Sequence, residues 1–110
     1  MHTIKSHQDF ERVFTQGKRF NHPLIRMVIC DCASEGDPAR VAFAAAKRLG
    51  NAVVRNRSKR VLRETARACE LPVQGKEIIL FATARTRTSS PEDMRGALES
   101  LLRRAGVNHA

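Results

Sequence analysis

The chain has 110 residues, a mass of 12.3 kDa and a formal net charge of +9, because 20 Lys and Arg stand against 11 Asp and Glu. This length predicts one domain over residues 1–110, with an ordered core at about 4–106. No apolar run reaches the ~18–20 residues that cross a bilayer, and the N-terminus has no signal-peptide core. With three cysteines, an odd number, these features favour a reduced, cytoplasmic chain over secreted, membrane or disulfide-stabilised classes.

A helix is the first element predicted along the chain. Ser6 can cap it and Gly17 ends it, while Phe10, Val13 and Phe14 recur at i, i+3 and i+4. Apolar residues at this spacing are most often core. Val13 fits that interpretation, whereas the two phenylalanines are either core or exposed rings on which bases could stack.

Extended chain is predicted next. Residues 19–32 are interrupted early by Pro23, after which 24–30 is an apolar, β-branched run. A turn cluster at 34–38 leads to a second strand at 40–47. The short connection predicts that these two strands form an antiparallel hairpin.

The second half of the chain alternates helix and strand. A long helix begins after Asn51 as its cap and runs to about Glu70, a buried strand follows at 77–82, and a last helix starts after Ser90 and ends at Gly106. The order helix–strands–helix–strand–helix predicts a single-domain α+β fold, an α/β sandwich with helices packed on a sheet.

The positive charge is concentrated in residues 47–67, which hold eight basic groups and one acid, +7 of the total +9. Arginine grips phosphate with two bonds, so this segment favours nucleic acid over an ordinary solvated helix face. In the long helix, four basic residues follow at i, i+4 spacing on the side away from the apolar arc, and two further residues flank them. The basic-stripe residues are Arg55, Lys59, Arg63 and Arg67, with Asn56 and Arg60 beside them and Arg57 outside the stripe.

Two basic residues precede the long helix. Lys47 and Arg48 stand next to its positive end, which is a good place for a phosphate. The alternative is that they only solubilise the end of a strand. Phe20, just before Pro23, is a further aromatic candidate for nucleic-acid binding.

A catalytic or metal site on the protein itself is not predicted. The histidines show no HxxxH spacing, the acids no paired spacing, and no Gly-rich phosphate loop is present. Cys30, Cys32 and Cys69 lack the CxxC spacing of zinc ligands, so we expect them to be free thiols.

Residues 47–64, KRLGNAVVRNRSKRVLRE, resemble the bacterial ribonuclease P protein component. The shared features are a basic pair, Gly-Asn-Ala-Val, Arg-Asn-Arg, Lys-Arg and a further Arg along one helix. Asp9-Phe10, Val13-Phe14 and Gly17 are similar to the family's opening helix, and Arg40-Val41 to its strand entry. The resemblance extends over roughly residues 4–105.

The resemblance implies a fold like the second domain of ribosomal protein S5, with a left-handed strand–helix–strand crossover. It also implies a catalytic RNA partner, with which the family removes the 5′ leader of precursor tRNA using Mg²⁺ held mainly by the RNA. Neither a membrane nor a small-molecule substrate is implied. RNA contacts map to Arg55, Asn56, Arg57, Lys59, Arg60 and Arg63. A leader-binding cleft maps to Phe10 and Phe14, with Phe20 as a further candidate for the cleft. A stand-alone RNA-binding module of ribosomal-protein type is the alternative.

The chain departs from the family pattern in its aromatic residues. It has no Tyr or Trp, and the strand expected to line the cleft reads Met27-Val28-Ile29. Fewer rings would then be available to leader bases, and each lost stack weakens binding by ~1–3 kcal/mol. Ala42 stands where the family often has Gly, which we interpret as a packing variation.

Overall fold

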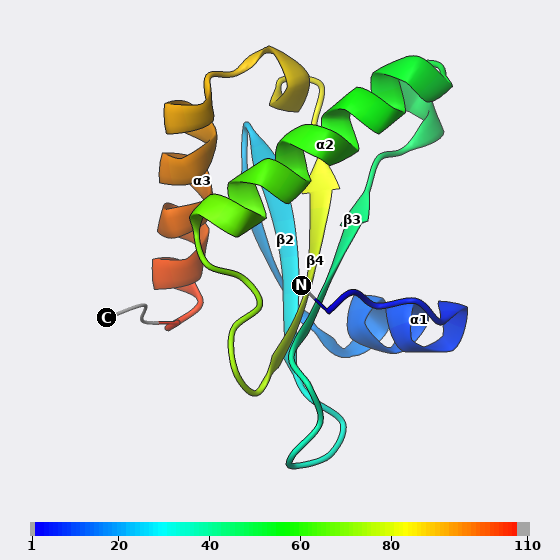
Figure 1. Ribbon diagram of the computed structural model, residues 1–110, viewed down its shortest axis with the longest axis vertical. Helices are drawn as coiled ribbons and strands as arrows, with labels where there is room; N and C mark the ends of the chain where they lie inside the picture. The colour runs from blue at the N-terminus through cyan, green and yellow to red at the C-terminus, as the bar shows by residue number, and fades with distance from the viewer. Residues whose placement is uncertain (1, 108–110) are drawn as a thin grey trace.

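The computed structural model describes residues 2–107, which form three helices and four strands with two short 3₁₀ turns. The elements are α1 (His7–Gln16), β1 (Lys18–His22), β2 (Ile25–Asp31), β3 (Arg40–Ala44), η1 (Lys47–Leu49), α2 (Ala52–Ala68), β4 (Lys76–Ala82), η2 (Thr86–Thr88) and α3 (Pro91–Arg104). The predicted order of helix, strands, helix, strand and helix is confirmed (Figure 1).

Each helix begins at the residue predicted to cap it. The side-chain oxygens of Ser6, Asn51 and Ser90 each accept a hydrogen bond at 3.1 Å from the backbone N–H three residues further on. These bonds satisfy donors that the first helical turn leaves without an intrahelical partner. The helix starts are therefore local properties of the sequence.

The sheet has the strand order β1-β2-β4-β3. The predicted hairpin between β2 and β3 is wrong, because β4 lies between them, antiparallel to β2 and parallel to β3. Ile78, Ile79 and Leu80 are completely buried, so β4 has apolar surface to cover on both faces and takes a central place. The hairpin joins β1 and β2 instead, with the turn at Pro23 and Leu24.

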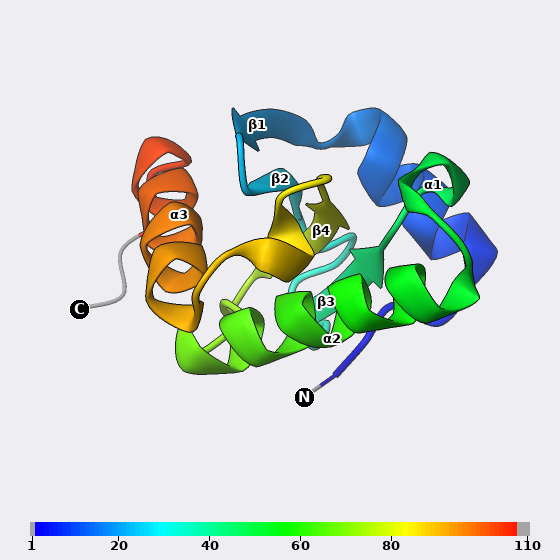
Figure 2. The same ribbon diagram turned by 90° about the horizontal axis from the view of Figure 1, so that it is seen from above.

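The connection from β3 through α2 to β4 has an uncommon hand. In Figure 1 both strands point upward, α2 crosses in front of them, and β4 lies to the left of β3. Figure 2 agrees, since it places α2 on one side of the sheet and keeps β3 and β4 in the same order. The crossover is therefore left-handed, as the family resemblance implied, whereas ~98% of such units are right-handed.

Helices cover both faces of the sheet. One core joins α2 and α3 to alternate sheet residues such as Met27 and Leu80, and a smaller core joins Val13 of α1 to Val28 and Ile79 on the other face (Figure 2). Because side chains alternate across a strand, neighbouring residues of one strand serve different cores.

The buried face of α2 differs from the apolar face that helical periodicity predicts at two alanines. The spacing predicts that Val54, Ser58, Val61, Leu62, Thr65, Ala68 and Cys69 pack on the sheet. Ser58, Leu62, Thr65 and Cys69 are buried, but Ala66 is buried as well and Ala68 is exposed. Ala66 follows Leu62 by four residues, which places it on the same face. Within residues 2–107 the longest helix has 17 residues, and none is long and apolar enough to cross a bilayer.

Candidate nucleic-acid interface

The outer face of α2 carries the basic residues that the sequence singled out. Their side chains are exposed or half-buried: Asn56, Arg57, Arg60, Arg63 and Arg67 are exposed, and Arg55 and Lys59 are half-buried. The seven ion pairs found within residues 2–107 all lie elsewhere. In that part of the chain no carboxylate oxygen therefore lies within 4.0 Å of these basic groups, and their charge is available to a polyanion.

Two arginines of this face are held by the fold. The Arg63 guanidinium lies over the Phe43 ring, with its central carbon 5.3 Å from the ring centroid, which fixes the side chain beside β3. The Nε of Arg55 is buried and has no hydrogen-bond partner within the described residues. Buried donors are usually paired, so this N–H is a place where a phosphate or ribose oxygen could bind.

Lys47 and Arg48 lie in η1, between β3 and the first turn of α2, and both are exposed. They were predicted to bind phosphate beside the helix end. Arg48 lines a cleft on the α1 side of the sheet, whereas Lys47 is not among the residues that line it. The basic pair therefore stands at the connection between the α2 surface and this cleft.

The cleft has a volume of about 450 Å³ and lies against the part of the sheet that α1 leaves uncovered. Its floor is apolar and includes Val28 and Phe81, while Phe14 of α1 forms one wall. Polar side chains surround it: Arg19, Asn21, Arg26 and Arg48. No ion pair within residues 2–107 involves these three arginines.

Three phenylalanines meet at the α1 side of the cleft. Ring centroids of Phe10 and Phe14 are 6.4 Å apart, and Phe81 lies 6.3 Å from the first and 5.8 Å from the second. The Arg19 guanidinium lies 4.4 Å from the Phe14 centroid. Phe14 and Phe81 line the cleft, whereas Phe10 is not among its lining residues and packs against both rings. The two interpretations therefore apply to different residues. Phe14 lines the cleft, where a base could stack on it, whereas Phe10 packs beside it against the smaller core.

Phe20 does not join these rings, so its assignment to the cleft is corrected. It packs against the core formed by α2 and α3, because its partner in the β1–β2 register is Met27, which faces that core. Phe81 belongs to the strand at 77–82 that the sequence predicts to be buried, yet it is half-buried and lines the cleft. The sequence signal for this location is its position next to Leu80. Adjacent residues of a strand point to opposite faces, so Phe81 faces the side of the sheet opposite to the core that contains Leu80.

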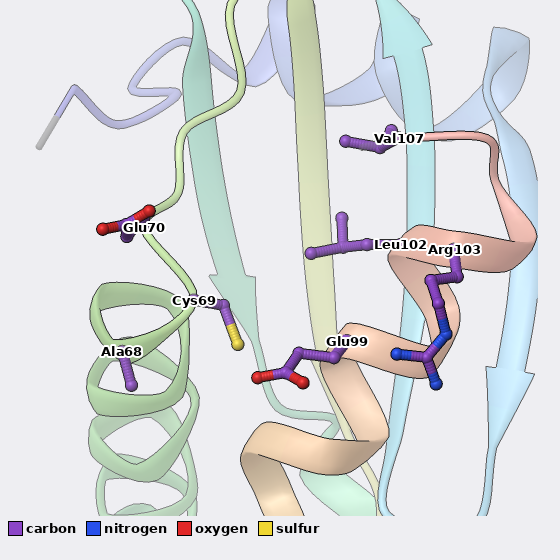
Figure 3. A pocket seen from close by; sticks show the side chains of 7 residues that line it. All are labelled: Ala68, Cys69, Glu70, Glu99, Leu102, Arg103 and Val107. Atoms are coloured by element: carbon purple, nitrogen blue, oxygen red, sulfur yellow. The ribbon is translucent and has the colours of Figure 1, made fainter. Parts of the chain in front are cut away.

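A separate hollow lies between the C-terminal ends of α2 and α3 (Figure 3). Glu70, Glu99, Arg103 and the Cys69 thiol line it, together with three apolar side chains. Burial, and then the negative charge of Glu99, raise the pKa of Cys69 to about 11, so the sulfur carries its proton at neutral pH. No group of three or more His, Cys, Asp or Glu side chains that could hold a metal ion occurs within residues 2–107.

Comparison with known proteins gives one consistent relationship. The protein-family model described as Ribonuclease P matches residues 1–106. The ribonuclease P protein components of Gluconacetobacter diazotrophicus and Symbiobacterium thermophilum are 35% and 39% identical to this chain. The first alignment covers 99% of this chain and 95% of the relative, and the second covers 94% and 90%.

Solved structures with this fold include two bacterial RNase P proteins. The Staphylococcus aureus protein superposes with a TM-score of 0.79 at 29% identity, covering 97% of both chains. The Thermotoga maritima protein superposes with a TM-score of 0.76 and covers 94% of this chain and 97% of its own. Its identity is 22%, so this second likeness bears on the fold alone.

Proposed function

Because the chain belongs to the bacterial ribonuclease P protein family, we propose that it is the protein subunit that binds the catalytic RNA of ribonuclease P and the 5′ leader of precursor tRNA. In this role it promotes the Mg²⁺-dependent endonucleolytic removal of the leader and so produces mature tRNA 5′ ends. The observation that carries the proposal is the presence of two different basic surfaces on opposite sides of one sheet.

The α2 surface is assigned to the catalytic RNA. It is rich in arginine and, within the described residues, makes no ion pair with a carboxylate, which suits contacts to the phosphates of a folded RNA. Phosphate contacts supply affinity and orientation but do not read sequence. Recognition through this surface would therefore depend on the shape of the RNA.

The cleft is assigned to the single-stranded leader. Single strands bind to proteins through aromatic rings that stack on bases and through basic groups that follow the backbone. Phe14 and Phe81 supply the rings, and Arg19, Arg26 and Arg48 supply the charge. Phe81 provides from β4 an aromatic surface that the sequence Met27-Val28-Ile29 of β2 lacks.

We assign the chemistry of cleavage to the RNA and to Mg²⁺ ions that it holds, and positioning and electrostatics to the protein. Basic side chains placed where RNA phosphates converge reduce their mutual repulsion, which lowers the Mg²⁺ concentration that assembly requires. The three free thiols fit a reducing compartment, and we place the protein in the cytoplasm.

The test is reconstitution of precursor tRNA cleavage at low Mg²⁺. The catalytic RNA with the protein is expected to cleave the leader faster than the RNA alone, and the protein alone is expected to give no cleavage. A protein that binds RNA but does not stimulate the catalytic RNA would be a stand-alone RNA-binding module. Cleavage by the protein without RNA would identify an autonomous nuclease, and either result would overturn the proposal.

A further inference from the structure

We propose that Asp9, Arg12, Arg40 and Glu77 form a charge-neutral network that positions α1, and with it the aromatic wall of the cleft, without contacting RNA. The proposal rests on the proposed function, since it assigns these four side chains to leader binding as positioning residues. It also divides the basic residues near the cleft into two kinds, those that hold the fold and those that face a ligand.

The network joins three elements around one buried carboxylate. Glu77 of β4 is 1% exposed, and its two oxygens accept hydrogen bonds from different arginines: Oε1 from Nη2 of Arg12 on α1 and Oε2 from Nη2 of Arg40 on β3, each at 2.6 Å. Asp9 of α1 completes the ring, because its Oδ2 accepts from Nη1 of Arg40 at 3.0 Å and its Oδ1 lies 3.8 Å from Nη2 of Arg12.

These bonds add fixed directions to the apolar packing of α1. Val13 is the single fully buried residue of α1, and it packs on small or branched side chains such as Val28 and Ala42. Phe10 and Phe14 add half-buried contacts to this packing. Apolar contacts are non-directional, whereas charge-assisted hydrogen bonds demand specific directions. Asp9 and Arg12 flank Phe10 in the sequence and Arg12 precedes Phe14 by two residues, so the network sets where both rings stand.

The charges of the network cancel within the protein. Two guanidinium groups meet two carboxylates, and the side chains of Arg12 and Arg40 are only 22% and 24% exposed. The hydrogen bond to Glu77 raises the pKa of Arg12 above its ordinary value, so this group stays charged. Arg19, Arg26 and Arg48, by contrast, take part in no ion pair within the described residues and line the cleft. The network therefore contributes geometry to leader binding and little electric field.

The decisive variant is Glu77→Gln. A role of the network in positioning α1 and a direct role of its arginines in binding RNA predict opposite changes in RNA affinity. If Arg12 and Arg40 bound RNA directly, removing the carboxylate would free positive charge and strengthen binding. If the network positions α1, the same change weakens binding of precursor tRNA to the reconstituted holoenzyme. We expect the ratio of affinities for precursor and mature tRNA to fall by about 5- to 10-fold, a partial loss of stacking on the displaced rings.

A second variant covers the case in which Glu77→Gln does not fold. Arg12→Gln leaves Glu77 paired with Arg40 and detaches only α1, so it should also lower the precursor-to-mature ratio. The salt dependence of leader binding should stay at the wild-type value, because no phosphate contact is lost. A slope reduced by about one would make Arg12 an RNA ligand and overturn the inference.

Leu98→Ala is the matched control for loss of stability. Leu98 is completely buried in α3, on the opposite face of the sheet from α1. It should lower the melting temperature yet keep the wild-type ratio of precursor to mature tRNA affinity. An unchanged ratio of precursor to mature tRNA affinity in both Glu77→Gln and Arg12→Gln would refute the positioning role. A wild-type holoenzyme that does not distinguish the two tRNAs with its protein present would count against the proposed function instead.

Discussion

Replacing one exposed arginine of α2 tests the proposed contact between this helix and the catalytic RNA. Arg60 is exposed, takes part in no ion pair within residues 2–107 and faces away from both cores. Gln has a similar helix propensity, so Arg60→Gln should leave the stability of the fold nearly unchanged. Any change in RNA binding can then be attributed to the lost charge.

The expected effect lies in the salt dependence of the binding constant. Each lost phosphate contact reduces the slope of log K against log salt concentration by about 0.7 to 0.9 in magnitude. Doubling the salt concentration should then weaken wild-type binding about 1.7-fold more than binding of the variant. Eight basic groups lie between residues 47 and 67, and none of them forms an ion pair within the part of the chain that the structure describes. They set an upper limit of about 6 to 7 on the magnitude of the wild-type slope contributed by this segment.

The assay is titration of labelled catalytic RNA with protein at several salt concentrations. Arg95→Gln is the matched control, since it removes the same charge from an exposed site on α3 where Arg95 already pairs with Glu99 at 3.7 Å. We expect the control to keep the wild-type slope. Equal changes in both variants would mean that only the net charge of the protein matters. An unchanged slope for Arg60→Gln would place that residue outside the interface.

Three further predictions concern the cleft and the end of α2. Phe81→Ala should weaken binding of precursor tRNA to the holoenzyme by about 5- to 150-fold, because a stacking ring is lost. Phe20→Ala is the control on the other face of the sheet. It should lower the melting temperature and leave the ratio of precursor to mature tRNA affinity unchanged. Glu70 has φ 60°, so Glu70→Gly should raise the unfolding free energy by about 0.5–1 kcal/mol in denaturant titrations, and Glu70→Ala should not. Cys69 loses its proton near pH 9 when unfolded but only at about 11 when folded, so its contribution to stability should decline by up to about 2–3 kcal/mol between these values as pH rises. Cys69→Ala should make the loss of stability over this range smaller, and the loss that remains comes in part from Cys30 and Cys32, whose pKa values burial also raises.

Features set by neighbours in the sequence could be predicted before the structure. The three helix starts depend on one capping side chain each, at Ser6, Asn51 and Ser90, and all three are confirmed. The basic face of α2 follows from i, i+4 spacing alone. β1 was not recognised as a separate strand, because it is a polar edge strand whose only apolar residue is Phe20.

Features set by distant parts of the chain could not be predicted from the residues. The position of β4 between β2 and β3 results from covering both of its apolar faces, and turn length alone favoured the wrong pairing. The left-handed crossover contradicts the general rule and entered only through the family resemblance. The predicted locations of Phe20 and Phe81 differ from the structure for the same reason: Phe20 packs against the larger core and Phe81 lines the cleft. Which face of the sheet a strand residue occupies depends on strand register.

The pairing of charges also depended on the fold. The sequence alone does not show which arginines pair with carboxylates. Arg40 binds the buried carboxylate of Glu77, whereas Arg60 faces solvent. Arginines that pair with carboxylates stabilise the fold, and the basic side chains left unpaired within the described residues form two surfaces, the outer face of α2 and the cleft. They meet at η1, where Arg48 reaches the cleft three residues before Asn51 caps α2. Under the proposed function, leader and catalytic RNA would approach one another there, so the positive charge of Lys47 and Arg48 would reduce the repulsion between their phosphates.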